Sequence, residues 1–123
     1  MPPADKQEWK AIRKIPDWAA APNQNNHRII RAFLQLQKER GFVCRPELEA
    51  RCQDPEGHAD VYVRDFRGNF TSMKTDAGKS HGKVFRDDGY NITICTEVLA
   101  TLEQYRSLFE AWLSSQTESF DSA

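Results

Sequence analysis

The chain has 123 residues, a formal net charge of −1, 39% hydrophobic residues and 28% charged residues. These values predict one domain with a soluble surface and a single modest hydrophobic core. They exclude a membrane helix, because no apolar run approaches the roughly 20 residues that a span needs. The N-terminus shows no apolar stretch typical of a secretory signal, and the three cysteines fit no disulfide pattern. We therefore expect a cytoplasmic protein with free thiols and no membrane partner.

Charge is unevenly distributed along the chain. Residues 27–45 carry five basic side chains against one acidic, a net charge of +4, and residues 64–86 carry six against two, again +4. Residues 96–123 carry one basic side chain against five acidic, a net charge of −4. The basic middle of the chain is typical of a surface for phosphate groups. Ordinary solvated faces of helices and strands are the alternative.

The first 25 residues are predicted to form an N-terminal arm and linker. Ile12 and Ile15 lie on one apolar side of a short helix, which Pro16 is expected to stop. The following "DWAAAPNQNN" is predicted to be a linker, with Trp18 docked on the domain. We expect the arm to complete the core.

The main domain is predicted to span residues 26–113. Asn26 caps a helix that begins near His27 and ends at Gly41, and "HRIIRAFLQLQKER" gives this helix a broad apolar face. A short β-prone run, "FVC", follows. The next segment, "RPELEARC", begins a second helix with Pro46 in its first turn, where proline is favoured.

The next stretch, "GHADVYVRDFRGNFTSMK", supports two interpretations. Its apolar residues recur at steps of 4, 3, 4 and 3, which is a helical period; they are Ala59, Val63, Phe66, Phe70 and Met73. However, "RDFRGNF" also fits a turn between two strands, which would give a non-winged α+β domain with a four-stranded β-meander. We predict a helix over residues 58–67 that ends at Gly68.

The segment "GKVFRDDGYNITIC" predicts a β-hairpin. Asp88 and Gly89 form a favoured turn. Tyr90, Ile92 and Ile94 alternate with polar residues, which indicates a strand with one buried face.

A long C-terminal helix is predicted from Thr96 to about Leu113, and residues 114–123 are predicted to be a flexible tail. The helix carries more apolar side chains than one small domain needs. We predict that the surplus, Leu99, Leu108 and Leu113, forms the interface of a homodimer. The alternative is a monomer in which the N-terminal arm covers this surplus.

This order of elements resembles the winged helix-turn-helix superfamily. The resemblance rests on "GFVCRPELEARC" followed by "GHADVYVRDF", and it covers roughly residues 26–113. The expected core positions of the two helices are filled by Leu48, Cys52, Ala59, Val63 and Phe66. The resemblance implies a small α+β winged-helix domain that binds double-stranded DNA, such as a transcriptional or replication regulator. Since many domains of this superfamily bind proteins, a protein–protein interaction module is the alternative.

Two departures bear on that function. Gln53 and Asp54 stand where the superfamily usually has a glycine and a small apolar residue. Pro55 is expected to open the third helix, and the exposed face of that helix would carry Glu56, Asp60, Val61 and Arg64. Two acids on that face would repel phosphates, which favours the interaction module.

Basic residues supply the candidate contacts to nucleic acid, because such side chains neutralise phosphates. These candidates are Arg28, Arg31, His58, Arg64, Arg67, Lys74, Lys79, His81, Lys83 and Arg86. Gly78-Lys79-Ser80 also ends the nucleotide-binding pattern G-x-x-x-x-G-K-[ST]. We reject a nucleotide site because the pattern's first glycine is Met73 and because a strand, rather than a helix, is predicted to follow.

No catalytic or metal site is predicted. Cys44, Cys52, His58 and His81 have no C-x-x-C pair or other zinc-binding spacing. A Cys95–His81 nucleophile–base pair is disfavoured, since Cys95 ends an alternating strand and is expected to close its core face. The sequence therefore predicts neither an enzyme nor a bound cofactor.

Overall fold

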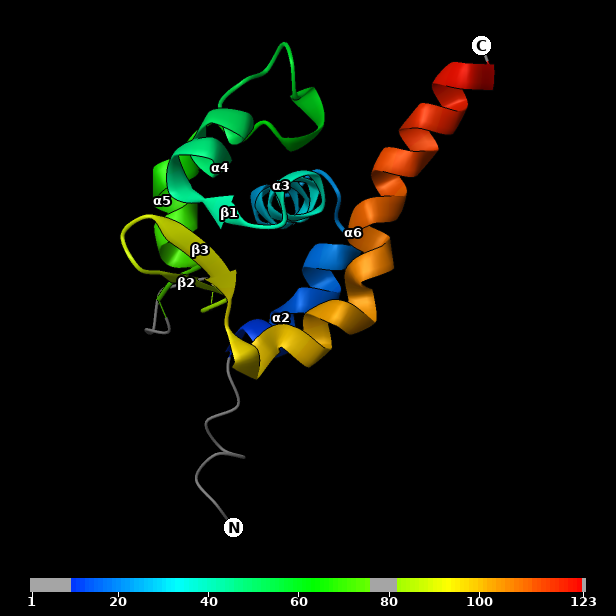
Figure 1. The fold of residues 1–123 in the computed structure, drawn as a ribbon. Coiled ribbons are helices and arrows are strands. Elements are labelled where there is room, and N and C mark those ends of the chain that lie inside the picture. The colour runs from blue at the N-terminus through cyan, green and yellow to red at the C-terminus, as the bar shows by residue number, and fades with distance from the viewer. Residues whose placement is uncertain (1–9, 76–81, 123) are drawn as a thin grey trace.

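The fold is a mixture of helices and a small antiparallel sheet, seen in a computed structural model that describes residues 10–75 and 82–122, with side chains as far as residue 110 (Figure 1). The helices are α2 (Lys10–Ala19), α3 (Asn25–Arg40), α4 (Arg45–Cys52), α5 (Phe66–Ser72) and α6 (Thr96–Ser122). A short 3-10 turn, η1 (Ala59–Val61), precedes α5, and the strands are β1 (Val43–Cys44), β2 (Phe85–Asp87) and β3 (Asn91–Ile94). The α+β class predicted from the sequence is confirmed.

The predicted hairpin is confirmed as β2–β3. Strand β3 is central, with the order β1-β3-β2 and antiparallel pairing on both sides. Val43 pairs with Ile92, and Phe85 pairs with Ile94. Gly89 lies in the turn with a φ of 105°, which a residue without a Cβ adopts easily. Tyr90 belongs to the turn and is exposed, so the buried face of β3 begins only at Ile92.

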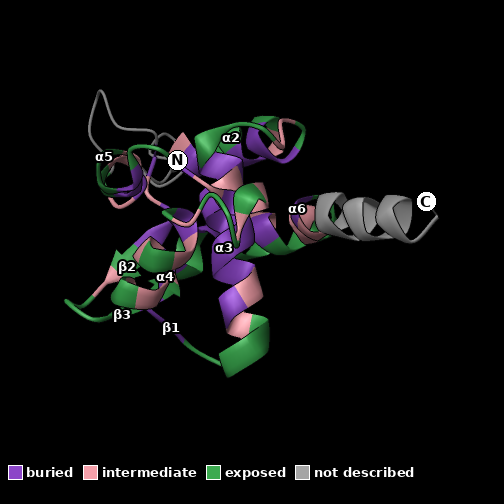
Figure 2. Cartoon of the chain, turned by 90° about the horizontal axis from the view of Figure 1, so that it is seen from above, coloured by how far each residue is buried: buried purple, intermediate pink, exposed green. Residues whose placement is uncertain are grey.

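Helix α3 crosses the centre of the molecule and is buried along most of its length (Figure 2). It begins at Asn25, with Gln24 rather than Asn26 in the capping position, and ends before Gly41, whose φ is 83°. Phe33 contacts Phe85 of the sheet, with ring centroids 5.4 Å apart. The sheet, α2, α5 and α6 pack around this helix, which places the core between them.

The arm is a helix whose inner side belongs to the core. Ile15 and Trp18 are buried in the main cluster, and α2 packs against α6. The prediction that Pro16 stops this helix is wrong, because α2 continues through Pro16 to Ala19. Proline has no backbone N–H and cannot make the hydrogen bond of an interior helical residue. Burial of the turn that follows Pro16 compensates for this loss and stabilises the helix.

The prediction of a helix over residues 58–67 is wrong. Only Ala59–Val61 forms a 3-10 turn, Tyr62 is extended, and α5 begins at Phe66, close to where the predicted helix was to end. Gly68 therefore lies inside α5 rather than after it. The alternative hairpin between residues 59 and 74 is absent too, since no strand occupies this described stretch.

Side chains of α3 explain why this connector is not helical. Arg28 donates to the carbonyl oxygens of Ala59 and Tyr62, and Arg31 donates to that of Asp60. A helix would need these oxygens for its own amide groups. Val61 and Val63 are both buried, and this two-residue period fits an extended chain better than a helix.

Helix α6 extends to Ser122. It thus includes most of the segment 114–123, for which the sequence predicts a flexible tail, and that flexibility stays a prediction. Figure 1 shows the helix passing α2 and then continuing away from the other elements.

Candidate nucleic-acid interface

The outer side of α5 carries a stripe of five exposed residues, and the exposed carboxylate of Asp65 lies directly beside it. Successive turns of a helix bring residues three and four apart onto one side, which aligns Arg67, Gly68 and Thr71. Arg64 lies in the turn before α5, and Thr75 lies after its end. Its members are Arg64, Arg67, Gly68, Thr71 and Thr75. The opposite side is buried through Phe66, Phe70 and Met73. We call the five exposed residues the α5 stripe.

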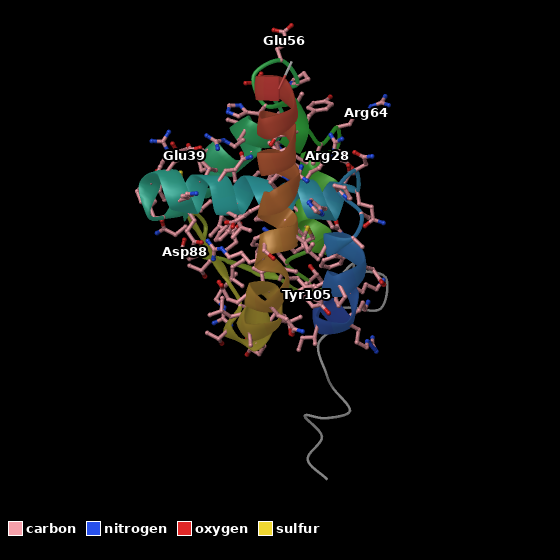
Figure 3. The ribbon with its side chains drawn as sticks, turned by 90° about the vertical axis from the view of Figure 1, so that its right-hand side faces the viewer. Arg28, Glu39, Glu56, Arg64, Asp88 and Tyr105 are labelled. Atoms are coloured by element: carbon pink, nitrogen blue, oxygen red, sulfur yellow. The ribbon has the colours of Figure 1, made fainter. Side chains whose placement is uncertain are left out.

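The two acids predicted on the recognition face lie elsewhere. Glu56 belongs to the turn after α4, and Asp60 belongs to η1, where it accepts a hydrogen bond from Gln35 of α3. In Figure 3 Glu56 projects from the loop at the top of the molecule, apart from Arg64. The acid that does lie at α5 is Asp65, its capping residue.

Asp65 organises the first turn of α5. Its side chain accepts a hydrogen bond from the Gly68 amide (3.2 Å), and its carbonyl oxygen accepts one from the Asn69 side chain (2.9 Å). A Cβ on Gly68 would lie 2.3 Å from the Asp65 carboxylate, so the glycine leaves room for this cap. An aspartate followed three residues later by a glycine before Phe70 was the sequence signal for the true start of the helix.

Arg64 and Arg67 present their guanidinium groups to solvent. Arg67 contacts Glu49 of α4 at 2.8 Å, yet its side chain remains 75% exposed. Arg64 is exposed and makes no ion pair with any residue that the structure describes. Both cations are thus accessible to a negatively charged partner.

Arg31 belongs to the interior. It is 1% exposed, and its guanidinium donates to the carbonyl oxygens of Asp60 (2.6 Å) and Phe109 (3.2 Å). It also donates to His27 Nε2 at 2.6 Å. Burial lowers the Arg31 pKa to about 10, which leaves the group charged at neutral pH. We therefore remove Arg31 from the candidate surface.

His27 completes this buried cluster, which we call the α3 cluster: His27, Arg28 and Arg31. His27 Nδ1 donates to the carbonyl oxygen of Trp18 (2.7 Å), and its other nitrogen accepts from Arg31, so the neutral ring satisfies both neighbours. Burial lowers the His27 pKa from 6.5 to about 4. The His27 ring also packs on Phe109, with centroids 4.6 Å apart.

Arg28 is half-buried, and its guanidinium donates to the backbone carbonyl oxygens of Ala59 and Tyr62 in the segment between α4 and α5. Its Nε atom is buried without a hydrogen-bond partner. The α3 cluster thus joins α2, α3, α6 and η1 through side chains. We assign Arg28 to this internal role rather than to the surface.

The basic residues near the hairpin are only partly available. Lys74 pairs with Asp87 at 3.0 Å and lies over the Phe70 ring, 5.0 Å from its centroid. Arg86 is more exposed and lies 3.7 Å from Glu97. Lys83 is half-buried. Lys79 and His81 lie outside the described residues, so their part in a basic loop stays a prediction.

His58 lies away from α5. It contacts Asp54 at 3.2 Å in the turn after α4, where Asp54 also accepts from the Gly57 amide. Pro55, expected to open the third helix, lies in this turn as well. His58 therefore stabilises a turn and does not extend the α5 stripe.

The thiols show no sign of activation. Cys44, Cys52 and Cys95 are free and buried. Burial raises the pKa of Cys52 to about 12 and also raises that of Cys95. In the part of the chain that the structure describes, no three His, Cys, Asp or Glu side chains lie together as metal ligands do.

Leu99 and Leu108, two of the three residues predicted for a dimer interface, lie on different sides of α6. Leu99 and Leu108 are both exposed, at 41% and 48%. Nine residues of α-helix turn by about 180° beyond two full turns, so the two leucines lie on opposite flanks of α6. The Leu113 side chain lies outside the described part. A single interface cannot use Leu99 and Leu108 together, and the homodimer itself stays a prediction.

Comparisons with protein families, with curated proteins and with solved structures return no match for this chain. Among the described helices, none is both long and apolar enough to cross a membrane.

Proposed function

We propose that this chain is a winged helix-turn-helix protein that binds double-stranded DNA, with α5 as the element that meets the duplex. The helices α3, α4 and α5 and the hairpin β2–β3 follow one another in the order that the sequence resemblance implies. The strand order β1-β3-β2 places the hairpin in one sheet with the strand that precedes α4. A role as a small transcriptional or replication regulator would follow from such binding.

The observation that carries this proposal is the pair of exposed arginines, Arg64 and Arg67, on the α5 stripe, beside the capping carboxylate of Asp65. Arg64 and Arg67 supply two accessible cations at the start of the helix, and Thr71 and Thr75 supply hydroxyl groups at its end. Gly68 lies between them, and the Asp65 carboxylate lies against its amide group. Cations of this kind neutralise phosphates, whereas hydroxyl groups hydrogen-bond either phosphates or base edges.

The hairpin would add a second contact. Arg86 is exposed on β2, and the predicted basic loop leads into this strand. Contacts of this kind position a protein on a duplex without reading its sequence. We therefore expect binding to duplexes of any sequence at low salt, with additional preference only where the α5 stripe reaches bases.

Substitution of the stripe arginines tests the proposal. Arg64→Ala and Arg67→Ala should each weaken binding to a random duplex, and each should lower the slope of log K against log salt by about one. The matched control is Arg40→Ala at the far end of α3, because Arg40 also pairs with a glutamate, Glu47, at 2.7 Å. Fluorescence anisotropy over a salt series would measure both quantities. Equal effects of all three substitutions, or no duplex binding at low salt, would refute the proposal.

A further inference from the structure

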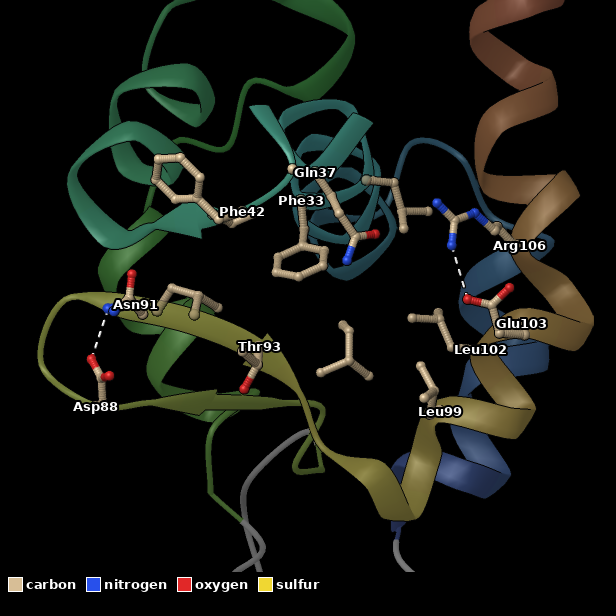
Figure 4. A pocket seen from close by; sticks show the side chains of 15 residues that line it. Phe33, Gln37, Phe42, Asp88, Asn91, Thr93, Leu99, Leu102, Glu103 and Arg106 are labelled. Carbon is tan, nitrogen blue, oxygen red and sulfur yellow. Dashed lines mark hydrogen bonds and ion pairs between the residues drawn. The ribbon is translucent and has the colours of Figure 1, made fainter. Parts of the chain in front are cut away.

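A groove opens between α3, the sheet and the first half of α6, and none of its lining residues belongs to α5 (Figure 4). Its volume is about 620 Å³. Phe33, Val43, Ile92 and Leu102 form a buried apolar floor, and Leu99 and Phe42 stand exposed at its margins. The groove is therefore separate from the candidate nucleic-acid interface.

Three of the exposed large apolar side chains lie at this groove or beside it. Four large hydrophobic side chains are exposed in the described part of the chain: Phe42 (54%), Tyr90 (55%), Leu99 (41%) and Leu108 (48%). Phe42 and Leu99 line the groove, and Phe42 and Tyr90 together line an adjoining hollow beside Cys44 and Glu47. Solvent-exposed aromatic and aliphatic side chains beside a concave surface are typical of protein-binding sites.

The charged residues that line the groove are Asp88, Glu103 and Arg106. On α6, Arg106 contacts both Glu103 (2.8 Å) and Glu110 (3.2 Å), so two carboxylates share one guanidinium and one negative charge remains. At the other end, Asp88 accepts hydrogen bonds from the Tyr90 and Asn91 amides, which lower its pKa and keep it charged. The groove lining therefore has a net charge of −1, and Glu110, which lies outside the lining, adds a negative charge beside Arg106.

One polar side chain reaches into the apolar part of the groove. Gln37 projects from α3 toward the space between Asn91 and Arg106 (Figure 4). Among the described residues its side-chain amide has no hydrogen-bond partner. An amide can donate and accept at once, so it suits the peptide groups of a bound polypeptide.

We propose that this groove binds a segment of a partner protein that carries apolar side chains flanked by lysine or arginine. The apolar side chains would cover the floor and contact Leu99 and Phe42, while the basic side chains would meet Asp88 at one end and the Glu103–Glu110 pair of carboxylates at the other. Gln37 would hydrogen-bond the backbone or a polar side chain of the segment. The proposal does not depend on DNA binding, and the two interfaces could be occupied together.

A helical peptide of leucine and lysine is the probe. A fluorescently labelled peptide of about 18 residues, long enough for several turns, should bind the full chain in an anisotropy titration. A matched peptide with glutamate in place of lysine should not bind. Equal binding of the two peptides, or binding of neither at millimolar protein, would overturn the proposal.

Leu99→Glu and Leu108→Glu form a matched pair that separates docking from simple charge attraction. Each adds the same charge to an exposed position of α6, but only Leu99 lines the groove. Docking predicts that Leu99→Glu weakens binding of the basic peptide by roughly tenfold, while Leu108→Glu leaves it unchanged or slightly tighter. If Leu99→Glu binds as tightly as Leu108→Glu, the groove is not the site.

Two further measurements complete the test. Phe42→Ala, which removes an exposed ring without adding charge, should also weaken binding of the basic peptide, so the result does not depend on one variant folding correctly. Sedimentation equilibrium of the unmodified chain addresses a second copy as occupant. A dimer that Leu99→Glu abolishes, with no peptide binding, would overturn the proposal in favour of self-association.

Discussion

Arg31 and Arg67 have the same side chain and lie in segments of equal net charge, yet they occupy opposite environments. Arg31 is 1% exposed and donates to two carbonyl oxygens and a histidine, whereas the side chain of Arg67 is 75% exposed and meets one glutamate at the surface. The α3 cluster stabilises the fold, and the α5 stripe is available to a partner. The comparison teaches that a basic segment predicts cations but not which of them reach solvent.

The largest effect should come from removing the buried cation. Arg31→Met should lower the free energy of unfolding by about 3 kcal/mol or more, because it leaves buried acceptors on three elements without donors. Urea denaturation followed by circular dichroism would measure it. Arg64→Met is the matched control at the surface and should change stability by less than about 0.5 kcal/mol.

If Arg31→Met and Arg64→Met lower the free energy of unfolding by similar amounts, Arg31 contributes no more to stability than a surface cation does. The contrast between Arg31 and the exposed arginines would then be wrong. A loss for Arg31→Met below about 1 kcal/mol would contradict the interior role.

Acid should act on the α3 cluster through His27. Its pKa is near 4 when folded and 6.5 in the unfolded chain, so the unfolded chain binds a proton first as pH falls. The contribution of the neutral His27 ring to the free energy of unfolding is complete above pH 6.5 and is lost between that value and pH 4. At pH 5 the loss should reach about 2 kcal/mol. Protonation would also place a second cation against Arg31.

A comparison of the unmodified chain with His27→Gln isolates this effect. Between pH 7 and 5 the stability of the variant should depend less on pH, since few carboxylates titrate in that range. Parallel pH profiles of the two proteins in thermal unfolding would show that His27 does not supply the acid sensitivity.

Local sequence signals predicted much of the fold. The hairpin followed from Asp88-Gly89 and the alternation after it, and α3 followed from its apolar face and Gly41. The prediction of a helix over residues 58–67 was wrong because it depended on local signals alone. The backbone carbonyls of this segment accept from Arg28 and Arg31, about 30 residues earlier in the chain, and no local pattern reports such a contact.

The candidate site was predicted in part. Arg64 and Arg67 were named from the sequence and are exposed, but the helix that carries Arg67 begins later than predicted. A period of 3 and 4 runs through Val63, Phe66 and Phe70, so periodicity alone could not locate the start of the helix. The cap at Asp65 does locate it, through a hydrogen bond to Gly68.

Substitution of the capping residue Asp65 should change the free energy of unfolding by an intermediate amount. Asp65→Ala should lower the free energy of unfolding by about 1 kcal/mol, as expected for loss of an N-cap. Asp65→Asn keeps an acceptor in the same place and should retain most of the stability. Equal stability of both variants would contradict the capping role.

The smallest effect concerns the ion pair of Arg67 with Glu49. The two groups are only 2.8 Å apart, which suggests a stabilising contact, but exposed pairs contribute at most about 1 kcal/mol because water and salt screen them. Arg67→Ala should therefore change stability by less than about 0.5 kcal/mol.

Arg51→Ala should lower the free energy of unfolding more, because Arg51 is only 12% exposed and contacts both carboxylate oxygens of Glu39 at 2.7 Å. A double-mutant cycle of Arg67→Ala with Glu49→Gln would measure the pair directly. A coupling energy above about 1 kcal/mol would mean that Glu49 holds Arg67 as part of the fold, and the contrast between the α3 cluster and the α5 stripe would then fail at this residue.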